Sequence, residues 1–169
     1  MIYSLVGFII AITHFNYSNP CKQDWKKITI KNAIEVSFPD TPIETFEKES
    51  GIFSLQKSNE TYTVKFSQYI ASPEMGESMI KLLKEGIASK MEEIASSKKD
   101  TKIISQNTDL YKKKYDYTQF VLLDNDSKKI IFYRFFFLKN MNITLSHFCD
   151  KLSGCSNKDL FFESLIINQ

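Results

Sequence analysis

Apolar and polar residues alternate over much of the chain after residue 24, a pattern typical of β-strands with one buried face. Residues 34–38, for example, read Ile-Glu-Val-Ser-Phe. Turn residues separate the strands, so we expect neighbouring strands to pair in antiparallel fashion. Residues 43–50 are a charged connector or the start of another strand. Similar alternating or continuously apolar runs predict strands at residues 25–30, 52–56, 61–70, 102–110, 115–123, 129–138 and 142–148.

One of the predicted strands is apolar on both faces. Residues 130–138 read Ile-Ile-Phe-Tyr-Arg-Phe-Phe-Phe-Leu. A strand without a polar face has to be covered on both sides, so we expect it to be central in a sheet with layers on both faces. Its one charge, Arg134, either pairs with a carboxylate such as Asp116 on a neighbouring strand, or lies at a cleft and contacts an anionic ligand.

A single long helix is predicted over residues 73–96, with Ser72 as cap and Pro73 in the first turn. A shorter helix at residues 156–162, capped by Ser156 or Asn157, and a last strand at 164–167 close the chain. The apolar residues of the long helix recur at helical spacing and predict one buried stripe. The predicted stripe contains Met75, Met79, Leu82, Leu83, Ile87, Met91 and Ile94.

Composition limits the number of domains and the kinds of partner. The chain has 169 residues, of which 43% are hydrophobic and 25% charged, enough for one core. We therefore take residues 22–169 as a single α+β domain. The net charge is +2, and Arg134 is the only Arg. Because Arg is the preferred residue for phosphate and base-edge contacts, nucleic acid is not an expected partner.

The first 20 residues contain no Asp, Glu, Lys or Arg, and residues 5–12 form an apolar run. A helix that spans a bilayer needs about 20 apolar residues, so this run fits a secretory signal better than a spanning helix. Residues 1–21 are thus predicted to be a signal peptide or membrane-attachment segment, which makes the protein exported, periplasmic or membrane-attached. Cys21 is a candidate for lipidation; simple cleavage and an uncleaved anchor are the alternatives.

Two further cysteines, Cys149 and Cys155, flank a loop of five residues. Gly154 allows a tight turn there, so the two sulfurs can meet. We predict a disulfide between them if the protein is exported, which would leave Cys21 unpaired. The alternative is two half-buried free thiols.

His147 is the candidate residue for chemistry, because it shares a strand face with Cys149. The two would suit a Cys–His nucleophile pair, or, with Asp150 and Cys155, a zinc site. Neither arrangement has a standard spacing, and the chain contains no Gly-rich phosphate loop, nucleophile elbow or His-Glu-x-x-His motif. We therefore predict no catalytic residue, cofactor or metal ligand, and interpret His147 as a half-exposed residue at a strand end.

Three short motifs, with the long helix and the meander of four strands, resemble the PsbP/Mog1-like domains over about residues 25–169. The motifs are Phe38-Pro39-x-x-Pro42, Tyr62-x-Val64 and Phe161-Phe162-x-Ser164-x-Ile166. The resemblance implies an α+β fold in which an antiparallel sheet of about six strands is flanked by helices on both faces. Members include a photosystem II accessory subunit, a Ran-binding nuclear protein and uncharacterised bacterial envelope proteins. The export-like start favours the last group.

These observations favour an exported, non-enzymatic accessory or protein-binding module of the bacterial cell envelope, with a protein partner. Two other functions remain as alternatives. One is a carrier of apolar ligands that uses the 73–96 helix and the sheet, which would require a large apolar cavity between them. The other is a Cys/His enzyme around His147 and Cys149, which would require free thiols.

Overall fold

The computed structural model describes residues 24–69, 77–97, 100–151 and 154–168. Residues 1–21, with Cys21, lie outside the described residues, as do residues 73–76 of the predicted helix. The described residues form ten strands and two helices: β1 (Lys26–Ile30), β2 (Ile34–Phe38), β3 (Ile43–Glu47), β4 (Ser50–Lys57), β5 (Glu60–Gln68), α1 (Glu77–Ser97), β6 (Thr101–Tyr111), β7 (Tyr115–Asp124), β8 (Lys129–Leu138), β9 (Met141–Asp150), α2 (Lys158–Glu163) and β10 (Ile166–Ile167).

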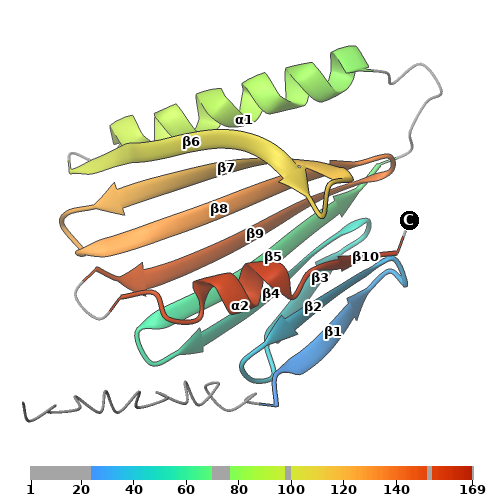
Figure 1. Cartoon of the computed structure of the whole chain (residues 1–169), viewed down its shortest axis with the longest axis horizontal. Helices are drawn as coiled ribbons and strands as arrows, with labels where there is room; N and C mark the ends of the chain where they lie inside the picture. Colours follow the sequence, from blue (N-terminus) through green and yellow to red (C-terminus); the bar gives the residue numbers. More distant parts are fainter. Residues whose placement is uncertain (1–23, 70–76, 98–99, 152–153, 169) are drawn as a thin grey trace, which may run out of the picture.

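Seven of these strands form one antiparallel sheet in the order β3-β4-β5-β9-β8-β7-β6 (Figure 1). The remaining three form a second antiparallel sheet in the order β1-β2-β10. Most neighbours in the large sheet are consecutive hairpins. The exception is the β5–β9 pair, which brings the first half of the chain beside the last and places Tyr62 opposite His147.

Different layers bury the two faces of the large sheet. On one face, α1 packs against the strands from β6 to β9, and on the other face β1, β2, β10 and α2 enclose a larger core. The first core contains Ile80, Leu83, Ile87, Met91 and Ile94 of the helix with Phe120, Leu122, Ile131, Phe135 and Phe137 of the sheet. The second core includes Tyr62, Val64, Phe66, Phe136, Ile143 and Leu145 of the sheet with Ile34, Val36, Phe38, Phe161 and Phe162.

The position of β8 confirms the central strand predicted from its two apolar faces. It lies between β7 and β9. Phe135 and Phe137 belong to the core beneath α1, whereas Phe136 and Leu138 belong to the core on the opposite face. The alternation of a strand thus distributes one apolar run between two cores.

The α+β class is confirmed, but the predicted sheet of about six strands flanked by helices on both faces is wrong in two details. The large sheet has seven strands, and its second face is covered mainly by a three-stranded sheet, with only the six-residue α2 added. The segment 43–47, left open between connector and strand, forms the edge strand β3. Alternation identifies a strand with one buried face, but strands of both sheets have that property.

The helix α1 buries the described part of the stripe predicted from its spacing, with one correction; Met75 and the side chain of Met79 lie outside what the structure describes. Leu83, Ile87, Met91 and Ile94 pack against the sheet, and Ile80 joins them. Leu82, which was predicted to be in the stripe, is 60% exposed because it lies about 100° around the helix from Leu83. No helix in the described residues is long and apolar enough to cross a membrane.

Gly51 of β4 lies beneath two aromatic rings. A Cβ atom there would lie 2.5 Å from a ring atom of the buried Phe66 and 2.7 Å from one of Phe46. We expect Gly51→Ala to lower the free energy of unfolding by about 1–3 kcal/mol, because the rings must move to admit the methyl group. Urea denaturation followed by circular dichroism measures this change.

Gly86 supplies the matched control. It is exposed in α1, and no atom lies within 4 Å of a Cβ built on it. Gly86→Ala is expected to raise the free energy of unfolding by about 0.5–1 kcal/mol through helix propensity. Equal effects of the two substitutions would contradict the close packing at Gly51.

Candidate functional site

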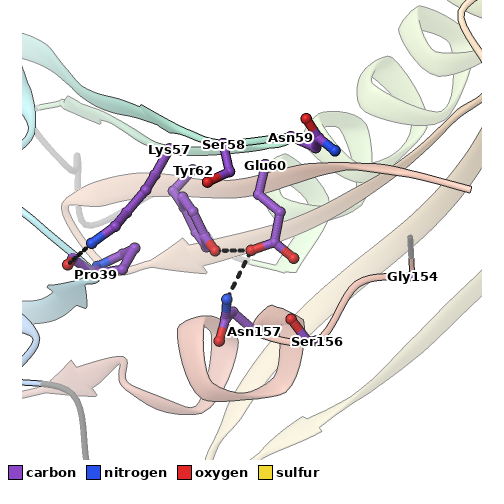
Figure 2. Close-up of a pocket in the computed structure, with 9 residues that line it drawn as sticks. All are labelled: Pro39, Lys57, Ser58, Asn59, Glu60, Tyr62, Gly154, Ser156 and Asn157. Atoms are coloured by element: carbon purple, nitrogen blue, oxygen red, sulfur yellow. Dashed lines mark hydrogen bonds between the residues drawn. The ribbon is translucent and has the colours of Figure 1, made fainter. Parts of the chain in front are cut away.

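A pocket of roughly 330 Å³ opens between the β4–β5 turn and the loop that enters α2 (Figure 2). Two stretches of chain far apart in the sequence therefore form it. Most of the residues that line it are of polar types: the lining consists of Pro39, Lys57, Ser58, Asn59, Glu60, Tyr62, Gly154, Ser156 and Asn157.

Glu60 is the one carboxylate among the described residues of this lining, and its side chain is only 12% exposed. Its Oε2 atom accepts a hydrogen bond from the Tyr62 hydroxyl and another, 2.9 Å long, from Asn157 Nδ2. Figure 2 shows the other carboxylate oxygen directed away from these two donors, toward the side of the pocket where Ser156 and Gly154 lie. One oxygen is thus held by the protein, and the other faces the pocket.

Lys57 is the one Lys or Arg among the described residues of the lining, and it points away from Glu60 (Figure 2). Its Nζ donates a 3.0 Å hydrogen bond to the Pro39 carbonyl and lies 3.8 Å from Asp40 Oδ2. The positive charge is therefore engaged at the opposite rim, and the negative charge of Glu60 dominates the centre of the pocket.

His147 lies behind Glu60, on β9 opposite Tyr62. It is fully buried, which corrects the prediction of a half-exposed strand end. Its ring packs against Tyr62, Phe132 and Phe161, with a centroid distance of 4.8 Å to Tyr62. Nε2 lies 3.7 Å from Glu60 Oε2, and neither ring nitrogen has a hydrogen-bond partner among the described residues.

These surroundings set the charge of each group. Burial lowers the pKa of the His147 imidazole, and Lys158 lowers it further, although Glu60 opposes both effects. Burial raises the pKa of the Glu60 carboxyl, but hydrogen bonds from Tyr62 and Asn157 and the nearby His147 lower it more, so the net pKa is lowered. Burial and the adjacent Glu60 raise the pKa of the Tyr62 phenol. At neutral pH Glu60 is therefore ionised at the pocket, and His147, buried behind it, is neutral.

The local sequence explains how Glu60 reaches this position. A two-residue turn joins β4 to β5, and its first residue, Ser58, adopts a φ of +54°. Glu60 is the first residue of β5 and lies two positions before Tyr62, so its side chain is on the same face as the inward row. Glu60 is not among the site residues predicted from the sequence; the sequence signal that identifies it is an acidic residue that extends an inward-facing row.

The predicted disulfide between Cys149 and Cys155 is confirmed, with 5.4 Å between the two Cα atoms. It joins Cys149, near the end of β9, to Cys155, which directly precedes Ser156. Gly154 adopts a φ of +76° in the loop that the disulfide closes. The disulfide thereby fixes the segment that brings Asn157 to Glu60. Of the two predicted caps of α2, Ser156 and Asn157, Asn157 occupies the N-cap position. Its side chain donates a hydrogen bond to Glu60 and makes no capping hydrogen bond.

The disulfide affects both arrangements considered for His147, the Cys–His pair and the zinc site. Both sulfurs are bonded to each other, so the Cys–His nucleophile pair and the zinc set with Asp150 are not assembled. In the part of the chain that the structure describes, no group of three or more His, Cys, Asp or Glu could hold a metal ion.

Arg134 has a structural role at a different place. Its guanidinium lies between the rings of Tyr117 and Phe162, at 5.0 and 4.7 Å from their centroids. Nε donates a hydrogen bond to Gln119, and Nη1 pairs with Glu163 at 3.0 Å. The predicted partner, Asp116, is instead paired with Lys84 of α1, with 3.6 Å between its Oδ2 atom and the Lys84 Nζ atom. The predicted Arg134–Asp116 pair is wrong because the actual partner, Glu163, belongs to α2. The order of the strands along the chain does not predict where that helix packs.

Protonation of His147 should make the fold less stable in mild acid. The unfolded chain binds a proton on this residue near pH 6.5, whereas the folded chain does so only at lower pH. The stabilising contribution is complete above pH 6.5 and is lost as the pH falls toward the lowered pKa. Glu60, Lys158 and Tyr62 are the titratable groups that face the ring. We expect His147→Leu to have a smaller pH dependence of the unfolding free energy between pH 5 and 6.5; an unchanged slope would contradict the assignment.

No family model and no curated protein matches the chain. Among solved structures, the fold is similar to the solution structure of cyanobacterial PsbP (CyanoP) from Synechocystis sp. PCC 6803, with a TM-score of 0.61 and 12% identity. That match covers 86% of this chain and 93% of the cyanobacterial one. It confirms the PsbP-like fold, and at this identity it shows the fold alone.

A second similar structure is PA94 from Pseudomonas aeruginosa, a protein of unknown function. It is 10% identical, with a TM-score of 0.48, and the match covers 86% of this chain and 98% of that one. A likeness at that score is too weak to support a conclusion. The function has to be inferred from the site itself.

Proposed function

We propose that this protein is an exported, non-enzymatic binding module whose pocket receives a primary ammonium group of a partner protein. The group would be a Lys side chain or an amino terminus. The observation that carries the proposal is the ionised carboxylate of Glu60, largely buried at an open polar pocket, with one oxygen held and one oxygen facing outward. A buried charge is costly unless it is paired, so such a carboxylate favours a cationic partner group.

The geometry of the carboxylate favours an ammonium over a guanidinium. Guanidinium groups bind best when they engage both carboxylate oxygens. Here Tyr62 and Asn157 already donate to Oε2, which leaves only one oxygen for the ligand. A compact ammonium needs only that one acceptor, and its remaining protons can reach neighbouring hydroxyl or carbonyl oxygens such as those of Ser156.

Two features support binding rather than catalysis. Cys149 is committed to a disulfide, and His147 is fully buried with its ring enclosed by aromatic side chains. A general base must come within hydrogen-bond reach of its substrate, which this enclosure opposes. The pocket lies near the lower end of the volume range of small-molecule sites, about 300–1,000 Å³, and suits one side chain of a partner.

The packing of α1 argues against a carrier of apolar ligands. Met91 is buried directly against the sheet, and Ile87 and Leu83 continue the same contact. These side chains act as core, which is the commoner role of a Met and Leu stripe on a helix.

The disulfide and the uncharged apolar run at residues 5–12 together support export, because structural disulfides belong to oxidising compartments. N-terminal analysis of the native chain, recovered from membrane fractions, tests this proposal. We expect a chain that begins near Cys21, with or without lipid on that residue. A chain that begins at Met1 in the cytosolic fraction would contradict export.

A photocrosslinking residue at Ser156, which is exposed at the pocket rim, tests the binding function. With the purified protein added to a cell extract, we expect a discrete crosslinked partner that is lost with Glu60→Gln. Treating the extract with an amine-acetylating reagent before crosslinking should also abolish it, whereas Arg residues are untouched. The matched control carries the crosslinker at Asn107, exposed on β6 at the far edge of the sheet. A Ser156 crosslink that survives both Glu60→Gln and acetylation would refute the proposal.

A further inference from the structure

The strand β3 ends the large sheet and is exposed along its whole length. It pairs only with β4, and all five of its residues are exposed. One side of its backbone therefore presents N–H and C=O groups that no other strand in the described residues pairs with. Such an edge is a template for pairing with another extended chain.

The exposed side chains of β3 include two large apolar residues. Ile43 is 76% exposed and Phe46 is 56% exposed, and alternation places them on opposite faces of the sheet. Ile52 of β4 lies opposite Thr45 and extends the apolar surface on the Ile43 face. On that face a small pocket of roughly 160 Å³ lies between Thr45, Glu47 and Lys65, among other residues. An added strand would cover apolar surface on both faces of the sheet. One of its side chains could enter this small pocket.

The charge around β3 indicates what an added strand should carry. Residues 40–49 contain four carboxylates and a single Lys. Two of the carboxylates, Glu44 and Glu47, belong to β3 itself, and neither makes an ion pair within the described residues. Opposite charges across a strand pair are favourable, and like charges are unfavourable. A second copy of this chain would bring the same acidic stretch against itself, so the edge favours a basic partner.

We propose that β3 binds an extended antiparallel segment of a partner protein in which two Lys or Arg residues, three positions apart, lie opposite Glu44 and Glu47, and apolar residues lie opposite Ile43 and Phe46. Main-chain hydrogen bonds would provide affinity, and the Ile43, Phe46 and glutamate side chains would provide specificity. This surface is distinct from the Glu60 pocket and is carried by different observations. It predicts a preference for sequence pattern, whereas the pocket predicts a preference for one ammonium group.

An acetylated, amidated octapeptide with Arg at positions 3 and 6, Val at positions 4 and 7 and Thr elsewhere (the Arg–Val peptide) tests this proposal, because it contains no primary amine that could enter the Glu60 pocket. The full chain, labelled with ¹⁵N, is titrated with this peptide and with its Glu–Val counterpart. We expect the Arg–Val peptide to shift the amide signals of β3. It should bind at least about fivefold more tightly than the Glu–Val peptide, because it forms two cross-strand charge pairs with Glu44 and Glu47. Glu60→Gln should leave this binding unchanged, which separates the two proposals.

Reversal of the edge charge is the decisive variant. Glu44→Lys combined with Glu47→Lys changes two exposed side chains and should invert the preference toward the Glu–Val peptide. An unchanged preference, or shifts confined to other strands, would overturn the proposal. A concentration-dependent dimer of the unliganded chain that the double variant abolishes would also overturn it, in favour of pairing between two copies.

Discussion

Cys155→Ser is expected to lower the free energy of unfolding by about 2 kcal/mol. The Cys149–Cys155 bond closes a loop with a sequence separation of 6, and a cross-link over so short a loop restricts the unfolded chain by about that amount. Urea denaturation of the oxidised wild type and of the variant measures the difference. The wild type in reducing agent should match the variant, and the variant should not respond to reducing agent.

The same substitution should also disturb the pocket. The disulfide anchors the segment that carries Ser156 and Asn157, and Asn157 donates a hydrogen bond to Glu60. We expect amide signals of Tyr62 and Asn157 to shift or broaden in Cys155→Ser, while those of β6 at the far edge remain unchanged. A variant that is as stable as the oxidised wild type, with an unperturbed pocket, would show that the disulfide does not organise the site.

Glu60→Gln is expected to reduce the affinity for the partner at least about tenfold while the fold is retained. A hydrogen bond to a charged group contributes about 1.5–3 kcal/mol, and the substitution removes the charge but keeps the shape. The amide oxygen can still accept from the Tyr62 hydroxyl, so we expect only a small change in stability. The yield of the Ser156 crosslink as a function of extract concentration measures the affinity.

Glu60→Ala separates the two roles of this carboxylate. It leaves the Tyr62 hydroxyl and the Asn157 amide without their acceptor. We therefore expect it to lower the free energy of unfolding by about 1–3 kcal/mol and also to reduce the affinity for the partner. Equal partner affinity in the wild type and in both variants would show that Glu60 does not recognise the partner.

The sequence predicted the elements of the fold well where the side-chain period decides the structure. The alternation in β2 and β5 and the two-sided run in β8 each correspond to a strand with the expected buried faces. The described part of the stripe of α1 was predicted apart from Leu82, and the disulfide was predicted from the short loop around Gly154. All of these depend on contacts that are local in the sequence or on a repeat within one element.

The candidate site depends on contacts that the sequence alone does not specify. Glu60 meets Asn157 across a separation of 97 residues, and His147 is buried because α2 and β8 place Phe161 and Phe132 against it. The same limit explains the wrong partner for Arg134, since Glu163 reaches it from α2. The period of a strand determines which face a residue occupies, whereas the packing of the second layer determines what covers that face.

The most direct test of the pocket is a titration of the ¹⁵N-labelled full chain with lysine amide derivatives. Nα-acetyl-lysine amide presents one ammonium group, the Nε-acetylated form presents none, and Nα-acetyl-arginine amide presents a guanidinium. We predict that the first compound shifts the amide signals of Glu60, Tyr62 and Asn157, that the arginine compound does so more weakly, and that Glu60→Gln abolishes the effect. Equal shifts with the Nε-acetylated compound, or shifts that persist in Glu60→Gln, would contradict the pocket's role as an ammonium site.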